Sequence, residues 1–279
     1  MDVETGDGSL EIDLVRRVDG RTGVAALVQR FPQRVTAPMY LDDDAPGAAY
    51  LCVQNPTGAL FDGDHLRTRV HVGPGAGLQL GDQSATQVMP SRSASQRFAF
   101  RVDGGGVLEH IPHPVVPHRG ATFAQDTEID LRGDAVYLGW EILAPGRVGH
   151  GERFVYASVS QRLCLRCDGE PVARENLTLV PAGADPRTPG TLGAADHLAT
   201  AVFAAPARTE VVEALAPMLT AALADVPYVR GAASPLPETV GVTVRVLATR
   251  APALRAALRT AWALARRELL GRHRLPGRI

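Results

Sequence analysis

Apolar and polar residues alternate along most of the chain between residues 10 and 180. In the segment "LRTRVHV", residues 66–72, Leu or Val alternates with Arg or His, except that Thr68 takes one apolar position. The segment "RFAFRV", residues 97–102, alternates in the same way. A period of two is typical of β-strands that have one buried face and one solvent-facing face.

Turn signals separate these strand-length runs. The glycines of "DGGG", residues 103–106, predict a turn, and the Asp-Gly pair of "CDGEP", residues 167–171, predicts a β-hairpin. The runs recur about every ten residues, and no internal sequence repeat is present. This spacing indicates a mainly β fold, a layered or sandwich-like body of many short strands.

The pattern changes after residue 180. Residues 181–208 are rich in Ala, Gly and Pro, which favours a loop or crossover. Apolar residues then follow helical spacing over 211–223, alternate over 240–248, and return to helical spacing over 254–269, with Gly271 as a plausible C-cap. We therefore expect a β-rich body over 1–208 and a helix–strand–helix segment over 209–279, packed as one structural unit with two C-terminal helices.

Composition excludes several classes of protein. The chain has 279 residues, a formal net charge of −1 and no lysine, so lysine-based catalysis is impossible. Near-zero charge argues against nucleic acid and anionic membranes as partners. The sequence has no apolar run of the ~20 residues that span a bilayer. The acidic start "MDVETGDGSL" does not resemble a signal peptide, so we expect a cytoplasmic protein.

Two segments resemble metal sites only superficially. In "NPTGALFDGDHL", residues 55–66, Asp62 and Asp64 lack the further oxygen ligands of a calcium loop, so a Gly/Asp turn is favoured. "CLRC", residues 164–167, has the spacing of half a zinc site, but only Cys52 remains as a further thiol. Two buried structural thiols are favoured, and a redox dithiol is the minor alternative.

Three histidines occur in "EHIPHPVVPHRGA", residues 109–121. Imidazole is a good zinc or nickel ligand, but the prolines among them preclude a regular helix that would set ligand geometry. A surface loop with exposed His110, His113 and His118 is favoured, and a metal site is the weaker alternative.

Two carboxylates fall on otherwise apolar strand faces. In "DAVYLGWEIL", residues 134–143, both faces are apolar apart from Glu141, and Glu175 shares a face with Ala and Leu residues. A buried carboxylate is costly unless it is paired. One interpretation is a structural pair with Arg147 or Arg162. The other is a polar path through the β body. A carboxylate pair could also serve a hydrolase, although neither a nucleophile elbow nor a phosphate loop is present.

The order of several motifs resembles the UreD (UreH) family of urease accessory proteins. Residues 87, 89 and 59 depart from the family pattern, with Gln, Met and Ala in place of Lys, Tyr and Gly. The matching blocks occur in family order over about residues 15–180: "TAPMYL", "AAYLCVQNPTGALFDGDHL", "VHVGPGAGLQL", "SATQV", "ASQRFAFRV", "LEHIPHPVVPHRGA", "LGWEILAPGR", "GERF" and "DGEPVARENLTL", with "RELLGRHRLPGRI" at the end.

The resemblance implies a non-enzymatic chaperone. Family members bind apo-urease, recruit the helical protein UreF and the nickel-binding GTPase UreG, and pass nickel through an internal passage. No tightly bound cofactor is expected, only transient nickel. The alternative from a different class is a β-sandwich hydrolase that uses metal or carboxylate chemistry. The candidates for lining the passage are Glu141, Glu175, Gln83, Ser84 and Thr86.

The last predicted helix carries concentrated positive charge. From residue 251 onward there are seven arginines and one acidic residue. A basic outer face would suit partner binding, and a merely solvated face is the alternative. The interface candidates are Arg255, Arg259, Trp262 and Arg266.

Overall fold

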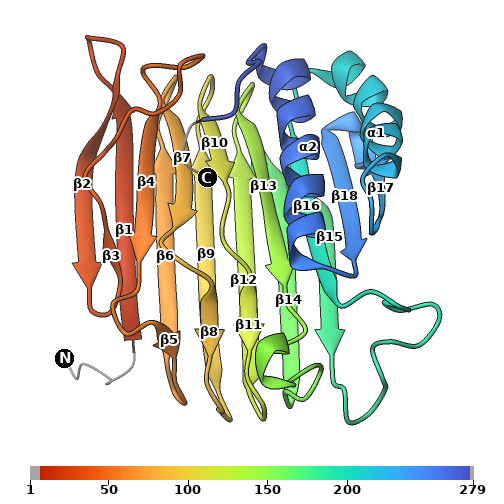
Figure 1. Cartoon of the computed structure of the whole chain (residues 1–279). Helices are drawn as coiled ribbons and strands as arrows, with labels where there is room; N and C mark the ends of the chain where they lie inside the picture. The colour runs from red at the N-terminus through yellow and green to blue at the C-terminus, as the bar shows by residue number, and fades with distance from the viewer. Residues whose placement is uncertain (1–6, 277–279) are drawn as a thin grey trace.

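Two β-sheets stack face to face, and two helices cover part of one outer surface (Figure 1). The computed structural model describes residues 7–276. The predicted mainly β fold with two C-terminal helices is confirmed. The first sheet has the order β15-β14-β12-β9-β6-β1-β2, with bounds β1 (Asp7–Arg16), β2 (Thr22–Arg30), β6 (His65–Val72), β9 (Ala94–Val102), β12 (Thr122–Leu131), β14 (Ser158–Cys167) and β15 (Glu170–Leu179).

The second sheet follows the order β17-β18-β16-β13-β10-β7-β4-β3, and three short strands join it beside this path. Its bounds are β3 (Arg34–Val35), β4 (Ala49–Gln54), β5 (Ala59–Leu60), β7 (Gly77–Asp82), β8 (Thr86–Val88), β10 (Val107–His110), β11 (Val115–Pro117), β13 (Val136–Leu143), β16 (His197–Ala204), β17 (Val229–Pro235) and β18 (Gly241–Ala248).

The chain alternates between the two sheets, so that strands within each sheet are mostly parallel. Strands β6, β9, β12 and β14 are parallel neighbours in the first sheet, as are β4, β7, β10 and β13 in the second. Tight turns connect β6 to β7, β9 to β10 and β12 to β13. Each turn contains one glycine with positive φ, namely Gly75, Gly105 and Gly133, a conformation that costs other residues energy. "DGGG" therefore joins two sheets, whereas the predicted hairpin at "CDGEP" joins β14 to β15.

The helices α1 (Thr209–Ala224) and α2 (Ala251–Leu270) pack on the outer face of the second sheet. The two tryptophans meet there, with the rings of Trp140 and Trp262 edge to face at 5.8 Å between centroids. Gly271 ends α2 as predicted, with φ of 66° and its N–H bonded to the carbonyl of Arg267. Short 3₁₀ turns lie at Val148–His150 and Pro237–Thr239. No helix within 7–276 has the length and apolar character needed to cross a bilayer.

The sequence placed residues 197–204 in a loop, and this expectation is wrong. These residues form β16, which pairs with β13 on one side and β18 on the other. Seven of the eight residues in "HLATAVFA" are buried, so neither face is polar enough to produce alternation. A strand buried on both faces lacks the period-two signal that revealed the other strands.

The space between the sheets contains two apolar clusters at opposite ends of the strands. One cluster includes Val72, Val102 and Leu131, at the carboxyl ends of β6, β9 and β12. The other includes Leu66 and Phe123, near the amino ends of β6 and β12. The residues between the two clusters are polar, so the apolar core is interrupted between its two ends.

Candidate functional site

A belt of polar side chains separates the two apolar clusters. In the first sheet, Gln96, Gln125 and Gln161 lie side by side in register on β9, β12 and β14. Gln125 and Gln161 are buried and Gln96 is half-buried. We define the polar belt as Gln33, Thr68, Gln96, Gln125, Thr127 and Gln161 on the side of the first sheet, with Asp82 and Glu141 from the second.

Hydrogen bonds connect members of the belt in pairs. The Gln33 amide donates to the Thr68 hydroxyl at 2.8 Å, and the Gln96 amide donates to the Gln125 carbonyl oxygen at 2.6 Å. Two buried atoms, Oε1 of Gln33 and Nε2 of Gln161, have no partner among the described residues. Buried polar atoms normally bond to protein or to water, so these two atoms leave hydrogen-bonding capacity inside the core that the described side chains do not use.

Glu141 lies at the centre of the belt. Its Oε1 accepts a 2.5 Å hydrogen bond from the Thr127 hydroxyl, and Gln125 also bonds to it. Burial raises the pKa of Glu141 to about 7 against the lowering effect of these bonds. The predicted pairing with Arg147 or Arg162 is wrong for Glu141. Those arginines bond to Glu152 and Asp126, respectively, both at 2.7 Å.

One end of the belt opens at a cavity of about 50 Å³. Three of the predicted passage residues, Gln83, Ser84 and Thr86, line it together with Asp82 and Gln96. Gln83 and Ser84 are exposed, so the cavity is open to solvent beside them. Asp82 accepts a hydrogen bond from the backbone N–H of His113, and burial raises its pKa to about 7. A cavity of this size holds only a few water molecules.

Glu175 lies at the far side of the sandwich, on the edge strand β15. Its carboxylate bonds to Arg245 at 2.5 Å and to the Thr243 hydroxyl at 3.1 Å, which bridges the two sheets. In the second sheet, Thr200 lies in register between Glu141 and Arg245. The structural-pair interpretation therefore holds for Glu175, with Arg245 as the partner, and polar groups continue from Glu141 toward this pair.

The expected exposed histidine loop is wrong for two of its three members. His110 ends β10, is buried against the rings of Phe98 and Phe100, and has no hydrogen-bond partner for either ring nitrogen among the described residues. Burial lowers the pKa of His110 to about 3. His118 is buried against the Gln87 carbonyl oxygen at 2.8 Å, and His113 is half-buried. Residues 7–276 contain no group of three or more potential ligands arranged to hold a metal ion.

We predict that His110→Leu stabilises the protein at pH 5 by about 2 kcal/mol more than at pH 8. In the unfolded chain the imidazole titrates at its ordinary pKa of 6.5, whereas in the folded chain it stays neutral down to about 3. Stability is therefore fully present above 6.5 and falls as the pH drops below it, by ~1.4 kcal/mol per pH unit. Urea unfolding at both pH values measures the difference.

The matched control is Phe100→Leu, which changes the same apolar environment but carries no titratable group. Its effect on the free energy of unfolding should be equal at the two pH values. An equal effect of His110→Leu at pH 5 and pH 8 would contradict the buried neutral imidazole.

The structure confirms the prediction for residues 55–66 and only partly supports the one for the two cysteines of residues 164–167. The turn predicted around Asp62 and Asp64 is confirmed, because Asp62 accepts bonds from the backbone N–H groups of Arg92 and Ser93 and Asp64 accepts one from Phe61. Cys164 and Cys167 are free thiols, as is Cys52, but both are only half-buried rather than fully buried. Burial still raises the pKa of the Cys167 thiol to about 11, which disfavours the reactive thiolate.

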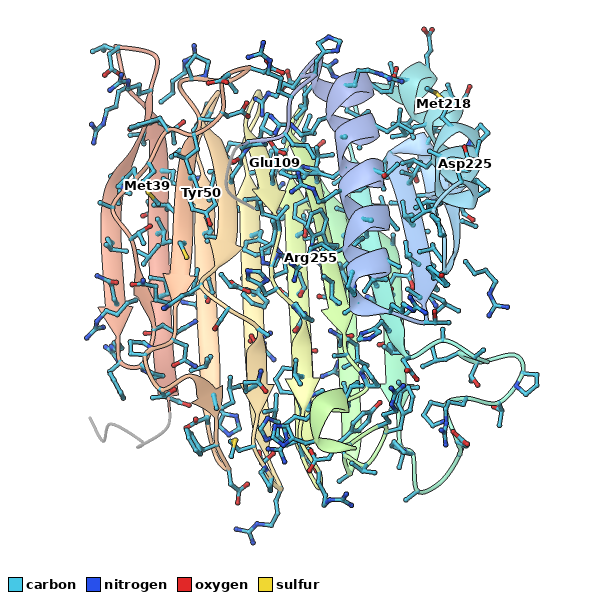
Figure 2. The ribbon with its side chains drawn as sticks, viewed as in Figure 1. Met39, Tyr50, Glu109, Met218, Asp225 and Arg255 are labelled. Atoms are coloured by element: carbon cyan, nitrogen blue, oxygen red, sulfur yellow. The ribbon has the colours of Figure 1, made fainter. Side chains whose placement is uncertain are left out.

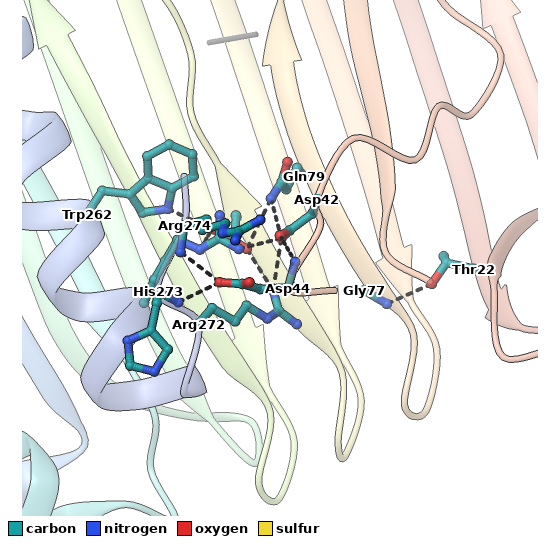
Figure 3. Close-up of polar contacts among 11 residues, drawn as sticks. Thr22, Asp42, Asp44, Gly77, Gln79, Trp262, Arg272, His273 and Arg274 are labelled. Carbon is teal, nitrogen blue, oxygen red and sulfur yellow. Dashed lines mark hydrogen bonds and ion pairs between the residues drawn. The ribbon is translucent and has the colours of Figure 1, made fainter. Parts of the chain in front are cut away.

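A second polar cluster fixes α2 to the sheet and corrects two interface candidates (Figure 3). Arg266 is fully buried and bonds to Asp42, with its Nε 3.5 Å from Glu109. The indole of Trp262, also fully buried, donates to Glu109 at 2.6 Å. Arg272 adds a 2.9 Å ion pair to Glu109. Trp262 and Arg266 therefore face the sheet and cannot contact a partner directly.

The basic outer face of α2 is smaller than the sequence predicted. Arg255 is an exposed residue of the first turns of α2, and burial together with the charge of Arg255 lowers the pKa of His113 (Figure 2). Arg259 is half-buried. Arg278, one of the seven arginines from which the basic face was predicted, lies outside the described residues.

Comparison with known proteins identifies the family. A family model described as "UreD urease accessory protein" matches residues 6–279. The chain belongs to the UreD family. A "Urease accessory protein UreD" from Mycolicibacterium gilvum (strain PYR-GCK) is 44% identical over 265 residues, which cover 94% of this chain and 95% of the relative.

Relatives from distant organisms carry the same name. The "Urease accessory protein UreD" of Natronomonas pharaonis is 33% identical, covering 95% of this chain and 88% of the relative. That of Haloarcula marismortui is 31% identical, covering 95% and 87%. These UreD proteins are named as accessory proteins rather than enzymes, and the resemblance drawn from the sequence motifs is confirmed.

Proposed function

We propose that this chain is a urease maturation factor that binds apo-urease, recruits UreF and UreG, and passes nickel along the polar belt to the urease active site. The observation that carries the proposal is the polar belt that divides the sandwich core. The family supplies the link to urease, because the relatives are named urease accessory proteins.

The energetic cost of the belt supports a role beyond stability. The carboxyl groups of Asp82 and Glu141 lie in or beside the core. Neither forms an ion pair with a basic residue within residues 7–276. Burying such groups costs several kcal/mol, so a core selected only for stability would use apolar residues here. An expensive polar layer that reaches solvent at Gln83 and Ser84 therefore favours transport.

The chemistry of the belt suits a hydrated divalent cation in transit. Its amide, hydroxyl and carboxyl oxygens bind cations weakly when they are spread along a path, whereas a closed ligand cage would trap the ion. With pKa values near 7, Asp82 and Glu141 can give up protons when a cation approaches and take them back after it leaves. Nickel is accordingly proposed as cargo, with no tightly bound cofactor.

The hydrolase alternative fits the geometry less well. Asp82 lines a cavity of about 50 Å³, far smaller than the ~300 Å³ or more of typical substrate pockets, and Glu175 lines a different cavity, of about 350 Å³, without Glu141. Glu175 is bound by Arg245, so it does not converge with Glu141 on one cavity. We propose a non-enzymatic protein of the cytoplasm, without nucleic acid or membrane as a partner.

The test is to co-express urease, UreF and UreG with and without this chain at the same nickel concentration. We expect urease that lacks this chain to contain less than about one tenth of the nickel per active site, since a tenfold deficit is well outside incomplete loading. Full nickel loading without this chain would contradict the proposed function.

A further inference from the structure

A second cavity, of about 530 Å³, lies away from the polar belt at the end of the strands where Gly75 and Gly105 form turns. Its walls come from the β1–β2 turn, residues 45–48, the β6–β7 turn and the segment after α2. Figure 3 shows part of its rim, where the Thr22 hydroxyl accepts the N–H of Gly77 at 2.8 Å and Arg272 lies opposite. Neither the apolar core nor the proposed nickel path accounts for this cavity.

The side chains that line the cavity carry an excess of positive charge. Arg16, Arg21 and Arg272 contribute three guanidinium groups, and Asp19 contributes one carboxylate. The Arg16 side chain donates to the carbonyl of Gly75 at 3.3 Å, and the Arg21 guanidinium stacks over the ring of Tyr40 at 5.0 Å. Neither forms an ion pair within the described part of the chain. This local excess contrasts with the net charge of −1 for the whole chain.

The rest of the wall is nearly free of side chains. Five glycines and three alanines line the cavity, so a ligand can approach the backbone closely while the guanidinium groups reach it from the sides. The planar guanidinium forms paired hydrogen bonds with carboxylate and phosphate oxygens alike. An unneutralised pair of arginines over an open backbone surface is the arrangement that such oxyanions require.

We propose that this cavity binds a small ligand with two or more negative charges on carboxylate or phosphate groups. The guanidinium groups of Arg16 and Arg21, which are not used in ion pairs within residues 7–276, match the two charges of a dianion, whereas Arg272 is already paired with Glu109. Arg272 connects the cavity to the buried cluster, because it also pairs with Glu109 at 2.9 Å. Ligand binding therefore stabilises the segment that follows α2, independently of the proposed nickel path.

The experiment measures binding of pyrophosphate and of citrate to the full chain by calorimetry in metal-free, low-salt buffer. Sodium chloride at equal ionic strength is the reference. We expect both anions to bind, and the Arg16→Ala, Arg21→Ala double variant to lose at least about tenfold in affinity, the effect of one charge-assisted hydrogen bond. Tighter binding of pyrophosphate than citrate assigns the site to phosphate ligands, and the reverse order assigns it to carboxylate ligands.

The control is Arg250→Ala, because Arg250 also stacks on a tyrosine, Tyr228 at 4.2 Å, but lies outside the cavity. Its affinity for both anions should match that of the unmodified chain. Arg16→Lys with Arg21→Lys keeps the charge and should retain part of the affinity. Binding of neither anion beyond the chloride reference, or equal binding by the double alanine variant, would overturn the proposal.

Discussion

Arg266→Met is expected to lower the free energy of unfolding by about 3 to 5 kcal/mol. Met replaces the apolar stem of Arg266 but removes the guanidinium that lies, fully buried, between Asp42 and Glu109. Two buried carboxylates would then share only Arg272, which is 2.9 Å from Glu109 and 3.9 Å from Asp42. Urea unfolding at pH 7 measures the loss.

Two further variants separate the buried charges from the helix itself. Arg267→Met removes the exposed guanidinium of the next residue in α2, which pairs with Glu268. It should lower the free energy of unfolding by less than about 1 kcal/mol. Adding Asp42→Asn to Arg266→Met removes the stranded charge, leaves Glu109 paired with Arg272, and should recover most of the loss. A cost for Arg266→Met no larger than that for Arg267→Met would show that the buried cluster does not hold α2 in place.

Glu141→Gln is expected to raise the free energy of unfolding by about 3 kcal/mol at pH 8 and to have little effect at pH 4. The folded chain keeps the Glu141 proton up to about pH 7, whereas the unfolded chain loses it near the ordinary value of 4.5. The unfolded state therefore binds fewer protons between these values, and stability falls as the pH rises through that window. Gln stays neutral and can still accept the Thr127 hydroxyl.

The measurement is the free energy of unfolding of Glu141→Gln and of the unmodified chain between pH 4 and pH 8. Ile142→Leu is the matched control, because its side chain lies on the opposite face of β13 toward the helices and does not titrate. A stability difference for Glu141→Gln that does not depend on pH would contradict a neutral buried carboxyl group.

Local patterns predicted the elements but not their partners. The alternation in β6 and β9 defined both strands, and the apolar stripe and Gly271 defined α2. The glycines of residues 103–106 give the same turn signal for a hairpin and for a connection between sheets, so the parallel arrangement within each sheet could not be predicted. Only the packing of the whole chain decides between them.

The site was predicted in part for the same reason. Glu141 stood out because every neighbour on both faces of its strand is apolar, whereas Gln125 looked ordinary in a strand that carries four acidic or amide side chains. The register of three strands is what aligns Gln96, Gln125 and Gln161 into a row. The residues of this row are far apart in the chain, so no local sequence pattern predicts that they lie side by side.

The error over Arg266 was avoidable from the sequence. Arg266 follows Trp262 by four residues, which places both side chains on the same face of the helix. That face of α2 also carries Leu258 and Leu269. The helical spacing therefore indicated that Arg266 is buried, whereas its charge suggested that it is exposed. Its acidic partners, Asp42 and Glu109, lie more than 150 residues earlier and gave no local sign of the pairing.

The central claim, that nickel travels along the polar belt, is tested most directly by blocking the belt at its centre. Gln125→Leu with Glu141→Leu replaces two neighbouring polar side chains by apolar ones, and Ile142→Leu on the outward face is the control. The measurement is the nickel content of urease after co-expression, with the assembly and melting temperature of each complex recorded. We predict a normally assembled complex whose urease contains at least about tenfold less nickel, because apolar side chains at the centre of the belt offer a cation no oxygen ligands. Wild-type loading by a normally assembled double variant would contradict the account.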